Sequence, residues 1–208
     1  VPDATKIDEV SYDEMLELAA TGAKVMQSRS VEFAKKFDVK FEVRSSLNNN
    51  PGTIVMEETD SMEAVVVRGV ALDKDQAKVT LVGVPDQPGM AGRVFSTLAK
   101  ASVNIDMIVQ NISHGTATPA TDISFTADKP DLAKAKKVID ELQAEVKFGE
   151  VIADENIAKV SVVGVGMRTH SGVAAKVFET LGEHGININM ISTSEIKISV
   201  VVEGGKGE

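Results

Sequence analysis

Two stretches of the chain carry nearly the same succession of apolar and polar residues. Residues 79–110 read VTLVGVPDQPGMAGRVFSTLAKASVNIDMIVQ, and residues 160–193 read VSVVGVGMRTHSGVAAKVFETLGEHGININMIST. In each, a β-branched apolar run predicts a strand, a glycine-containing loop follows, and apolar residues then recur at helical spacing. The two stretches align with a single two-residue insertion in the loop, and this pairs Gly89 with Gly172. The pattern therefore predicts an internal duplication.

The pattern around the first copy predicts a complete small unit. Strand-like runs and helix-like periodicity follow one another in the order β-α-β-β-α-β between residues 77 and 152. The expected elements are strands at 77–84, 103–113, 121–128 and 148–157, and helices at 88–102 and 130–145. A unit of this size buries little core alone, so the two copies are expected to pack against each other.

A different pattern precedes the duplication. Residues 11–37 have helical periodicity that Gly22 interrupts, and Ser11 followed by Glu14 has the spacing of a capping box. The elements expected after it are a strand at 39–46, a turn at 48–53, an acidic boundary without periodicity at 57–63, and a strand at 64–73 that turns into the strand at 77–84.

Composition narrows the range of partners and compartments. The chain has 208 residues, 43% of them hydrophobic, and a formal net charge of −9, which disfavours binding to a phosphate backbone. It has no cysteine, and no apolar run approaches the roughly 20 residues that a membrane helix needs. The opening VPDATKIDEV is too polar for a signal peptide and begins with Val, which suggests that residue 1 is not the natural start. We therefore expect a cytoplasmic chain, either whole or a fragment of a longer one, with neither nucleic acid nor a membrane as partner.

The loop between strand and helix is the best candidate for binding chemistry. Main-chain N–H groups at such a junction suit a carboxylate or a phosphate. Asp86 in the first loop, with Asp106 and Gln110 on the strand after the helix, offers acceptors for an ammonium or hydroxyl group. The spacing of four places Asp106 and Gln110 on one face of a regular strand. The alternative is that the glycines only make tight turns and the acids are solvated, and residue types alone favour it.

No motif indicates a self-sufficient catalytic centre. The three histidines, His114, His170 and His184, lack metal-ligand spacing, and GVGMRTHSG lacks the glycine spacing of a dinucleotide fingerprint. There is neither a phosphate-binding P-loop nor a serine in a nucleophile elbow. Met90, Met107 and Met190 are expected in the core.

The motifs together resemble those of the bacterial aspartate kinases. The similar segments are KIDEVSYDEMLELAATGAKVMQSRSVEFAKKFDVKFEVRSSLNNNPGT, VGVPDQPGMAGRVFSTLAKASVNIDMIVQNIS, TDISFT and the run from AKVSVVGVGM to ISTSEIKISVVV, which cover nearly the whole chain. The resemblance implies an enzyme that phosphorylates the side-chain carboxylate of aspartate with MgATP, the first step toward lysine, threonine and methionine. It also implies an N-terminal amino-acid-kinase domain and two ACT domains that bind lysine or threonine as feedback inhibitors.

The resemblance gives a domain assignment. Residues 1–60 correspond to the end of the α/β amino-acid-kinase domain plus a linker, 61–153 to the first ACT domain and 154–208 to the second. The fold class expected is α+β, with tandem ferredoxin-like βαββαβ units. The family's Lys-Phe-Gly-Gly nucleotide segment is absent, so no cofactor is expected in this chain and MgATP is assigned to the parent enzyme. The family continues after 197–203 with a helix and a strand where this chain reads GGKGE, so the second ACT unit is expected to be incomplete.

The resemblance also assigns effector-binding residues. The first pocket is predicted from Asp86, Gly89, Ala91, Asp106 and Gln110, closed by Asn187 and Ile188 of the second copy. A second, equivalent pocket is predicted from Met167, His170, Val173, Ser194 and Glu195. The first should prefer threonine to lysine, because it offers acceptors for an ammonium and a small hydroxyl but no long apolar slot.

Three functional hypotheses follow. The leading one is a regulatory, effector-binding module that is inactive alone, forms a homodimer mainly through residues 77–128, and acts on a catalytic domain or chain. The alternative is a separate assembly subunit that pairs with a full-length catalytic chain. A complete enzyme is the third, and the missing nucleotide segment argues against it.

Overall fold

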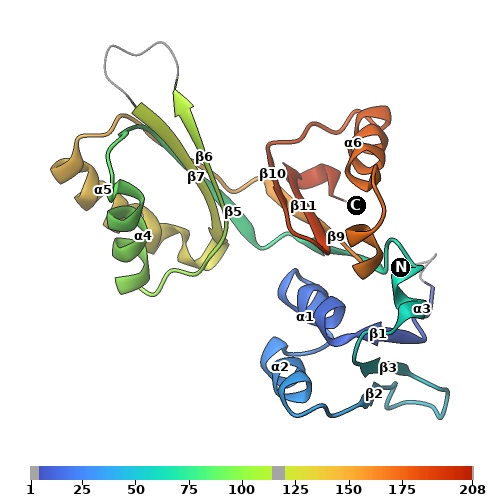
Figure 1. Cartoon of the computed structure of the whole chain (residues 1–208). Helices are drawn as coiled ribbons and strands as arrows, with labels where there is room; N and C mark the ends of the chain where they lie inside the picture. The colour runs from blue at the N-terminus through green and yellow to red at the C-terminus, as the bar shows by residue number, and fades with distance from the viewer. Residues whose placement is uncertain (1–4, 114–119, 208) are drawn as a thin grey trace. The chain divides into compact units, whose positions relative to one another are not determined.

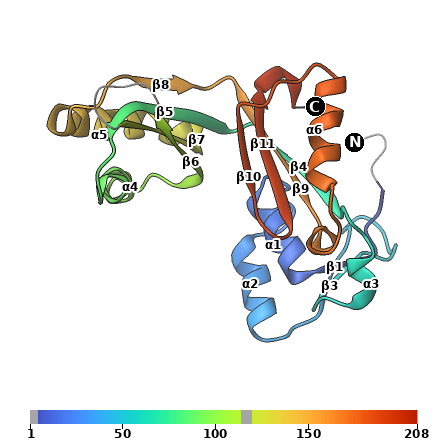
Figure 2. The same cartoon turned by 45° about the horizontal axis from the view of Figure 1, so that its top comes forward.

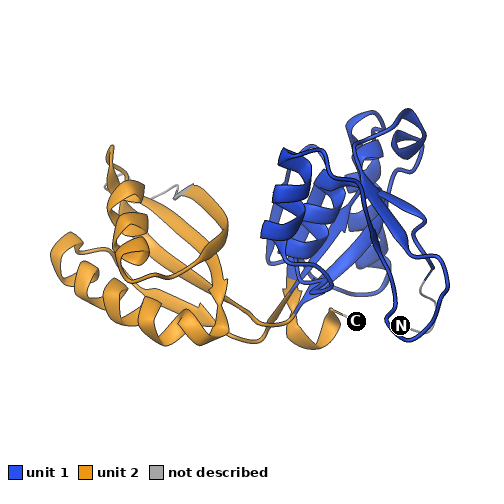
Figure 3. Cartoon of the chain, turned by 90° about the horizontal axis from the view of Figure 1, so that it is seen from below, with its two compact units in different colours: residues 1–73, 159–201, 208 blue, residues 74–158, 202–207 orange. Residues whose placement is uncertain are grey.

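The computed structural model describes residues 5–113 and 120–207. The chain divides into two compact units (Figure 3). One unit combines the chain up to Asp73 with Lys159–Val201, and the other combines Lys74–Ala158 with Val202–Gly207. The first unit contains two sheets and the second unit one, and each unit has its own buried core.

The unit built on residues 74–158 has the predicted βαββαβ order. Its elements are β5 (Gln76–Pro85), α4 (Met90–Lys100), β6 (Ile105–Ser113), β7 (Ala120–Asp128), the 3₁₀-helix η1 (Lys129–Asp131), α5 (Leu132–Val146) and β8 (Val151–Asp154). The strands form an antiparallel sheet in the order β6-β7-β5-β8. Both helices cover the same face of this sheet (Figures 1 and 2).

Alternation along the strands accounts for the core of this unit. Val79 and Leu81 of β5 point to the helix-covered face, because residues two apart on a strand share a face. They pack with Val94 and Leu98, which lie four apart on α4 and therefore on one side of that helix. The Phe95 ring meets Phe125 of β7 edge-on, with 5.8 Å between ring centroids. These side chains thus form one continuous core cluster.

The second copy has only the β-α-β-β part of this order, and an earlier strand supplies the fourth strand of its sheet. It comprises β9 (Ile157–Val163), the 3₁₀-helix η2 (Val165–Arg168), α6 (Val173–Glu183), β10 (Met190–Thr193) and β11 (Lys197–Glu203), followed by η3 (Gly204–Lys206). Its sheet has the order β10-β11-β9-β4, where β4 (Gly69–Asp73) precedes the first copy in sequence.

The pairing of β4 corrects the sequence-based picture of residues 64–73. That segment was expected to be a strand that turns directly into the next one, within the first ACT domain. The observed strand is shorter and pairs antiparallel with β9, from Gly69 opposite Val163 to Asp73 opposite Lys159. The sheet of the second copy thereby has four strands, as the first has. The sequence pattern indicates a strand but not the strand that it pairs with, because packing against neighbouring side chains decides the pairing.

The N-terminal part belongs to the same unit as the second copy. It contains β1 (Glu9–Ser11), α1 (Tyr12–Ala20), α2 (Ser28–Lys36), β2 (Phe41–Val43), β3 (Thr53–Met56) and the short α3 (Asp60–Glu63). In its three-stranded sheet, β3 lies between β1 and β2, parallel to the first and antiparallel to the second. The helices link the parallel pair, as a crossover connection requires. Their shared core includes Val10, Tyr12, Val31 and Val55.

Two sequence signals set the ends of α1. Ser11 caps its first turn, and the predicted capping box with Glu14 is present in both directions. Gly22 follows the helix with φ +114°, and a Cβ there would lie 2.8 Å from the Leu72 carbonyl oxygen. Glycine at this position therefore both ends the helix and lets the chain pass close to β4. Leu18 of α1 packs on that strand, against Ala71 and its neighbour Val163.

Local differences from the predicted elements lie in the region 39–63. Strand β2 is shorter than expected, β3 begins at the last residue of the predicted turn, and α3 forms within the acidic segment. Helix α3 has four residues, too few to show periodicity, and its buried residue Met62 packs on Val165 and Ile196. Tertiary packing thus formed an element that the pattern could not indicate. Across the described ranges, no helix is long and apolar enough to cross a membrane.

Candidate functional site

The two copies share an unusual helix start. Gly89 is the N-cap of α4 with φ 89°, and Gly172 is the N-cap of α6 with φ 91°. These left-handed conformations favour glycine, and glycine has no side chain to accept the N–H groups of the first helical turn. Neither cap makes a side-chain hydrogen bond. Neither junction therefore has a capping side chain to accept its first-turn N–H groups, and the binding of a ligand by main-chain donors near Gly89 and Ala91 stays a prediction.

The first loop is exposed and follows an irregular strand. Asp86 and Gly89 are exposed and Ala91 is half-buried. The register of β5 against β7 shifts between Leu81 and Val84, and the Gly83 N–H in this shift donates to Asp122 Oδ1 at 2.8 Å. Asp122 thereby anchors the base of the loop, a role that no short-range pattern indicated.

The register of β6 contradicts one premise of the predicted pocket. Ile105 pairs with Ala127, but Ile108 pairs with Phe125, so one extra residue lies between these pairs on β6. Such an extra residue reverses the facing of all that follow. Gln110, which pairs with Ile123, therefore shares a face with Ile105 and not with Asp106. The expectation that Asp106 and Gln110 point to one side is wrong, although both are exposed.

The residues expected to close the first pocket lie in the other unit. Asn187 is exposed and Ile188 half-buried, and both precede β10, where the Asn189 N–H donates to the Val201 carbonyl oxygen at 2.8 Å. Their pairing with the first loop stays a prediction. Met107 and Met190 are buried and Met90 packs against the core of its unit, as expected.

The second loop is folded on itself. Met167 lies in η2 and is half-buried, and Val173 opens α6. A ring nitrogen of His170 lies 2.8 Å from the Gly166 carbonyl oxygen, and the Thr169 hydroxyl donates to the same oxygen at 3.3 Å. His170 is thus a structural contact of the loop as well as a candidate ligand contact. His114, also noted in the sequence, lies outside the described residues.

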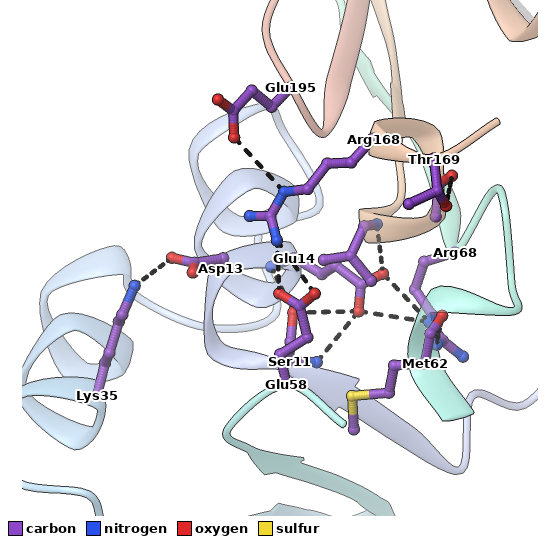
Figure 4. Close-up of polar contacts among 12 residues, drawn as sticks. Ser11, Asp13, Glu14, Lys35, Glu58, Met62, Arg68, Arg168, Thr169 and Glu195 are labelled. Carbon is purple, nitrogen blue, oxygen red and sulfur yellow. Dashed lines mark hydrogen bonds and ion pairs between the residues drawn. The ribbon is translucent and has the colours of Figure 1, made fainter. Parts of the chain in front are cut away.

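Arg168 joins this loop to two other segments (Figure 4). Its Nη1 donates to both carboxylate oxygens of Glu58, at 2.9 and 3.1 Å, and its Nε lies 3.5 Å from Glu195 Oε2. Glu195 and Ser194 form the turn between β10 and β11, where the Ser194 N–H donates to the Lys197 carbonyl oxygen. The structure therefore brings the β10–β11 turn to the loop, as the predicted second pocket requires. Arg168 and Glu58, which make this contact, were not identified from sequence.

A buried carboxylate holds the other end of the second loop. Glu14 Oε1 accepts a hydrogen bond from the Val165 N–H at 3.0 Å, across 151 residues of sequence. Arg68 Nε lies 3.4 Å from both oxygens of the same carboxylate. The capping-box spacing located Glu14 correctly but indicated only its local contacts.

Tyr12 and Asp131, neither of them a predicted site residue, have shifted pKa values. Burial raises the pKa of the Tyr12 phenol above its ordinary value, and the carboxylates of Asp38 and Glu57 raise it further. The side-chain hydrogen bond from Lys134 lowers the pKa of Asp131 at the start of α5. No group of three or more His, Cys, Asp or Glu side chains in the described part of the chain could hold a metal ion.

Comparison with known proteins identifies a family with this architecture. The ACT domain family matches residues 79–143 and 160–208. The chain is 46% identical over 205 residues to the aspartokinase of Pseudomonas aeruginosa, and the match covers 98% of this chain and 49% of that protein. The chain thus spans about half the length of the curated relatives it matches.

Solved structures agree in fold. The regulatory subunit of aspartate kinase from Thermus thermophilus, in its ligand-free form, is 39% identical, with a TM-score of 0.64, and the match covers 69% of this chain and 92% of that one. E. coli aspartokinase III in complex with lysine and aspartate, in the T-state, is 26% identical with a TM-score of 0.76. That match covers 100% of this chain and 45% of the E. coli chain.

Proposed function

Because the chain belongs to the ACT domain family and, within it, to the regulatory region of the aspartokinases, we propose that it binds an amino-acid effector and thereby regulates phosphorylation of aspartate. The whole protein would carry out that phosphorylation with MgATP, through parts of the family's enzyme that this chain does not contain. The observation that carries the proposal is the pair of glycine-capped strand–loop–helix junctions at Gly89 and Gly172.

The chemistry of these junctions fits a free amino acid. The first-turn N–H groups of α4 supply donors for the α-carboxylate, and the positive end of the helix dipole favours its charge. Asp86 and Asp106 supply carboxylates for the α-ammonium group. Asp122, by holding Gly83, fixes the strand end from which the loop starts.

Threonine is the effector that we assign to the first loop, as the sequence predicted. The exposed polar residues around the loop suit a small hydroxyl better than a long apolar stem, which would need an apolar slot to bury it. The proposal no longer requires Gln110, because the β6 register directs it to the other face from Asp106. The second loop is the lysine or second threonine site, and its contacts from Met167, His170, Val173, Ser194 and Glu195 remain part of the proposal.

The alternative of a separate assembly subunit is not favoured. The Thermus thermophilus regulatory subunit matches only 69% of this chain, whereas the E. coli aspartokinase III chain matches all of it. We propose that the N-terminal part with the parallel β1–β3 pair is the end of the family's kinase domain.

Calorimetric titration of the purified chain with threonine and with lysine, each alone, tests the proposal. Replacing Asp106 with Ala removes a charged partner of the ammonium and should weaken threonine binding by on the order of 2–4 kcal/mol. Asp140→Ala, on the exposed side of α5, is the matched control with the same change in net charge and should bind as the native chain does. Equal affinities of the native and Asp106→Ala chains, or heat from neither amino acid at millimolar concentration, would refute the assignment.

A further inference from the structure

The carboxylate of Glu14 lies where three distant segments meet (Figure 4). Its side chain is 0% exposed. Oε2 accepts hydrogen bonds from the Ser11 N–H at 3.1 Å and the Ser11 hydroxyl at 3.2 Å, which close the first turn of α1. Oε1 accepts from the Val165 N–H at 3.0 Å, at the start of η2. The two oxygens thus serve two different elements.

The charge of this carboxylate is compensated in place. A buried carboxylate is costly unless it is paired and hydrogen-bonded. Arg68, only 12% exposed, supplies the positive charge at 3.4 Å, and its Nη2 donates to the Met62 carbonyl oxygen at 3.3 Å. The guanidinium therefore also ties the carboxylate to α3. A capping-box glutamate needs only its contacts with the N-cap residue, here Ser11, to stabilise a helix. The contacts of Glu14 with Val165 and Arg68 therefore do more than cap α1.

The two repeats treat equivalent residues differently. Val165 aligns with Val84 of the first copy. Val84 pairs with Thr121 in the β5–β7 ladder, whereas the Val165 N–H donates to a side chain of α1. The first loop is thus anchored within its own sheet, and the second is anchored to a helix outside the repeat.

Carboxylates hold the second loop at two points. Glu14 accepts a hydrogen bond from Val165 near its beginning, and Glu58 and Glu195 pair with Arg168 three residues later. If the loop moves, these contacts must break or the residues that make them must move with it. The contact with Glu14 is buried. The same carboxylate closes the first turn of α1.

We propose that Glu14 is a positioning residue that couples the second loop, residues 164–172, to the first turn of α1, so that the two open together. The proposal rests on the proposed function only in taking this loop as ligand-binding. A ligand that moved the loop would then act on α1 through one carboxylate, without a separate hinge. The coupling itself exists without a ligand and can be measured without one.

Hydrogen exchange of single amides in the whole chain, followed by NMR, tests the coupling. The reporters are the Val165 N–H, bound to Glu14, and the Glu14 N–H, which donates to the Ser11 hydroxyl at 3.2 Å. Arg168→Ala removes the contacts of the loop with Glu58 and Glu195 and leaves the residues that bind the Glu14 carboxylate in place. We expect it to speed exchange at both reporters by the same factor, at least threefold.

Glu14→Gln keeps the side-chain shape but gives up the charge and one acceptor oxygen. In this background, Arg168→Ala should leave exchange at residue 14 unchanged within a factor of 1.5. Lys176→Ala, which removes an exposed cation of α6, is the matched control for the lost positive charge and should change neither reporter. Glu14→Asp, one methylene too short to reach both elements, can replace Glu14→Gln if the latter does not fold.

Two results would overturn the proposal. One is Arg168→Ala speeding exchange at Val165 but not at Glu14, which needs no Glu14 variant to be seen. The other is an equal effect of Arg168→Ala on exchange at residue 14 with and without the Glu14 substitution. The coupling between the loop and α1 would then run through Glu58 and β3, or the effects of the two substitutions would simply add. If neither threonine nor lysine binds in calorimetry, the proposed function is refuted, and the exchange result is unaffected.

Discussion

Gly166 is a position where a single added methyl group should strongly disturb the second loop. A Cβ built there would lie 2.5 Å from the Glu63 carbonyl oxygen and 2.7 Å from that of Val65. Carbon–oxygen contacts between main chains settle at about 3.3 Å, so the Glu63 carbonyl must withdraw by roughly 0.8 Å. Backbone atoms cannot rotate away as a flexible side chain can. Gly166→Ala must therefore separate η2 from α3.

The cost follows from what that separation disturbs. Val165 and Met62, which pack together at this contact, are 0% and 2% exposed. Inserting a methyl group into such a contact costs about 1–3 kcal/mol. For a chain of this size, each kcal/mol lowers the melting temperature by about 2–4 °C. Gly166→Ala should therefore lower it by roughly 2–12 °C.

Gly182→Ala is the matched substitution, and its expected effect on stability is opposite to that of Gly166→Ala. It lies inside α6, a methyl group added there would have nothing within 4 Å, and its φ is not positive. Replacing it with Ala should raise stability by about 0.5–1 kcal/mol, because the unfolded chain loses conformational freedom. Thermal unfolding followed by circular dichroism compares the two variants with the native chain. Equal melting temperatures for Gly166→Ala and Gly182→Ala would refute the steric reasoning.

Four further predictions concern other parts of the molecule. Tyr12 is the only tyrosine in the chain, so the rise in tyrosinate absorbance should come at a pH above 10 in the folded state, since burial raises its pKa. The pKa of Tyr12 is higher in the folded than in the unfolded state, so the contribution of the protonated Tyr12 phenol to the free energy of unfolding is complete below pH 10 and is lost as the pH rises from there through the folded-state pKa. Tyr12→Phe should lack that loss. A midpoint of the absorbance titration at or below pH 10 would contradict the prediction. The same variant should be neutral or up to about 1 kcal/mol more stable at pH 7 in urea unfolding, because the buried Tyr12 hydroxyl has no hydrogen-bond partner among the described residues. The chain should form a homodimer mainly through residues 77–128, where β6 is an edge strand with Ile108 51% exposed; only monomer in equilibrium sedimentation at tens of micromolar would count against it. The purified chain alone should show no MgATP-dependent phosphorylation of aspartate in a coupled assay, and measurable turnover would overturn this.

Several features of this protein follow from the sequence alone. The βαββαβ order of the first copy, the capping box at Ser11 and the break at Gly22 all depend on residues within a few positions of one another. Hydrophobic periodicity and turn chemistry act over that range, so a pattern can indicate them. The duplication was visible for the same reason, because each copy repeats its own local pattern. Gly89 and Gly172 were found as helix starts, and their positive φ angles explain why both are glycine.

Tertiary structure decided the rest. The pairing of β4 with β9, the extra residue in β6 and the contacts of the Glu14 carboxylate with Val165 and Arg68 each depend on residues far apart in sequence. A strand pattern specifies which residues face a core but not which strand lies alongside, and one inserted residue reverses the facing of those after it. A glutamate at a helix start likewise satisfies its local role with one oxygen. Only the folded chain determines which group the other oxygen binds, because burial leaves it no water and therefore requires a partner.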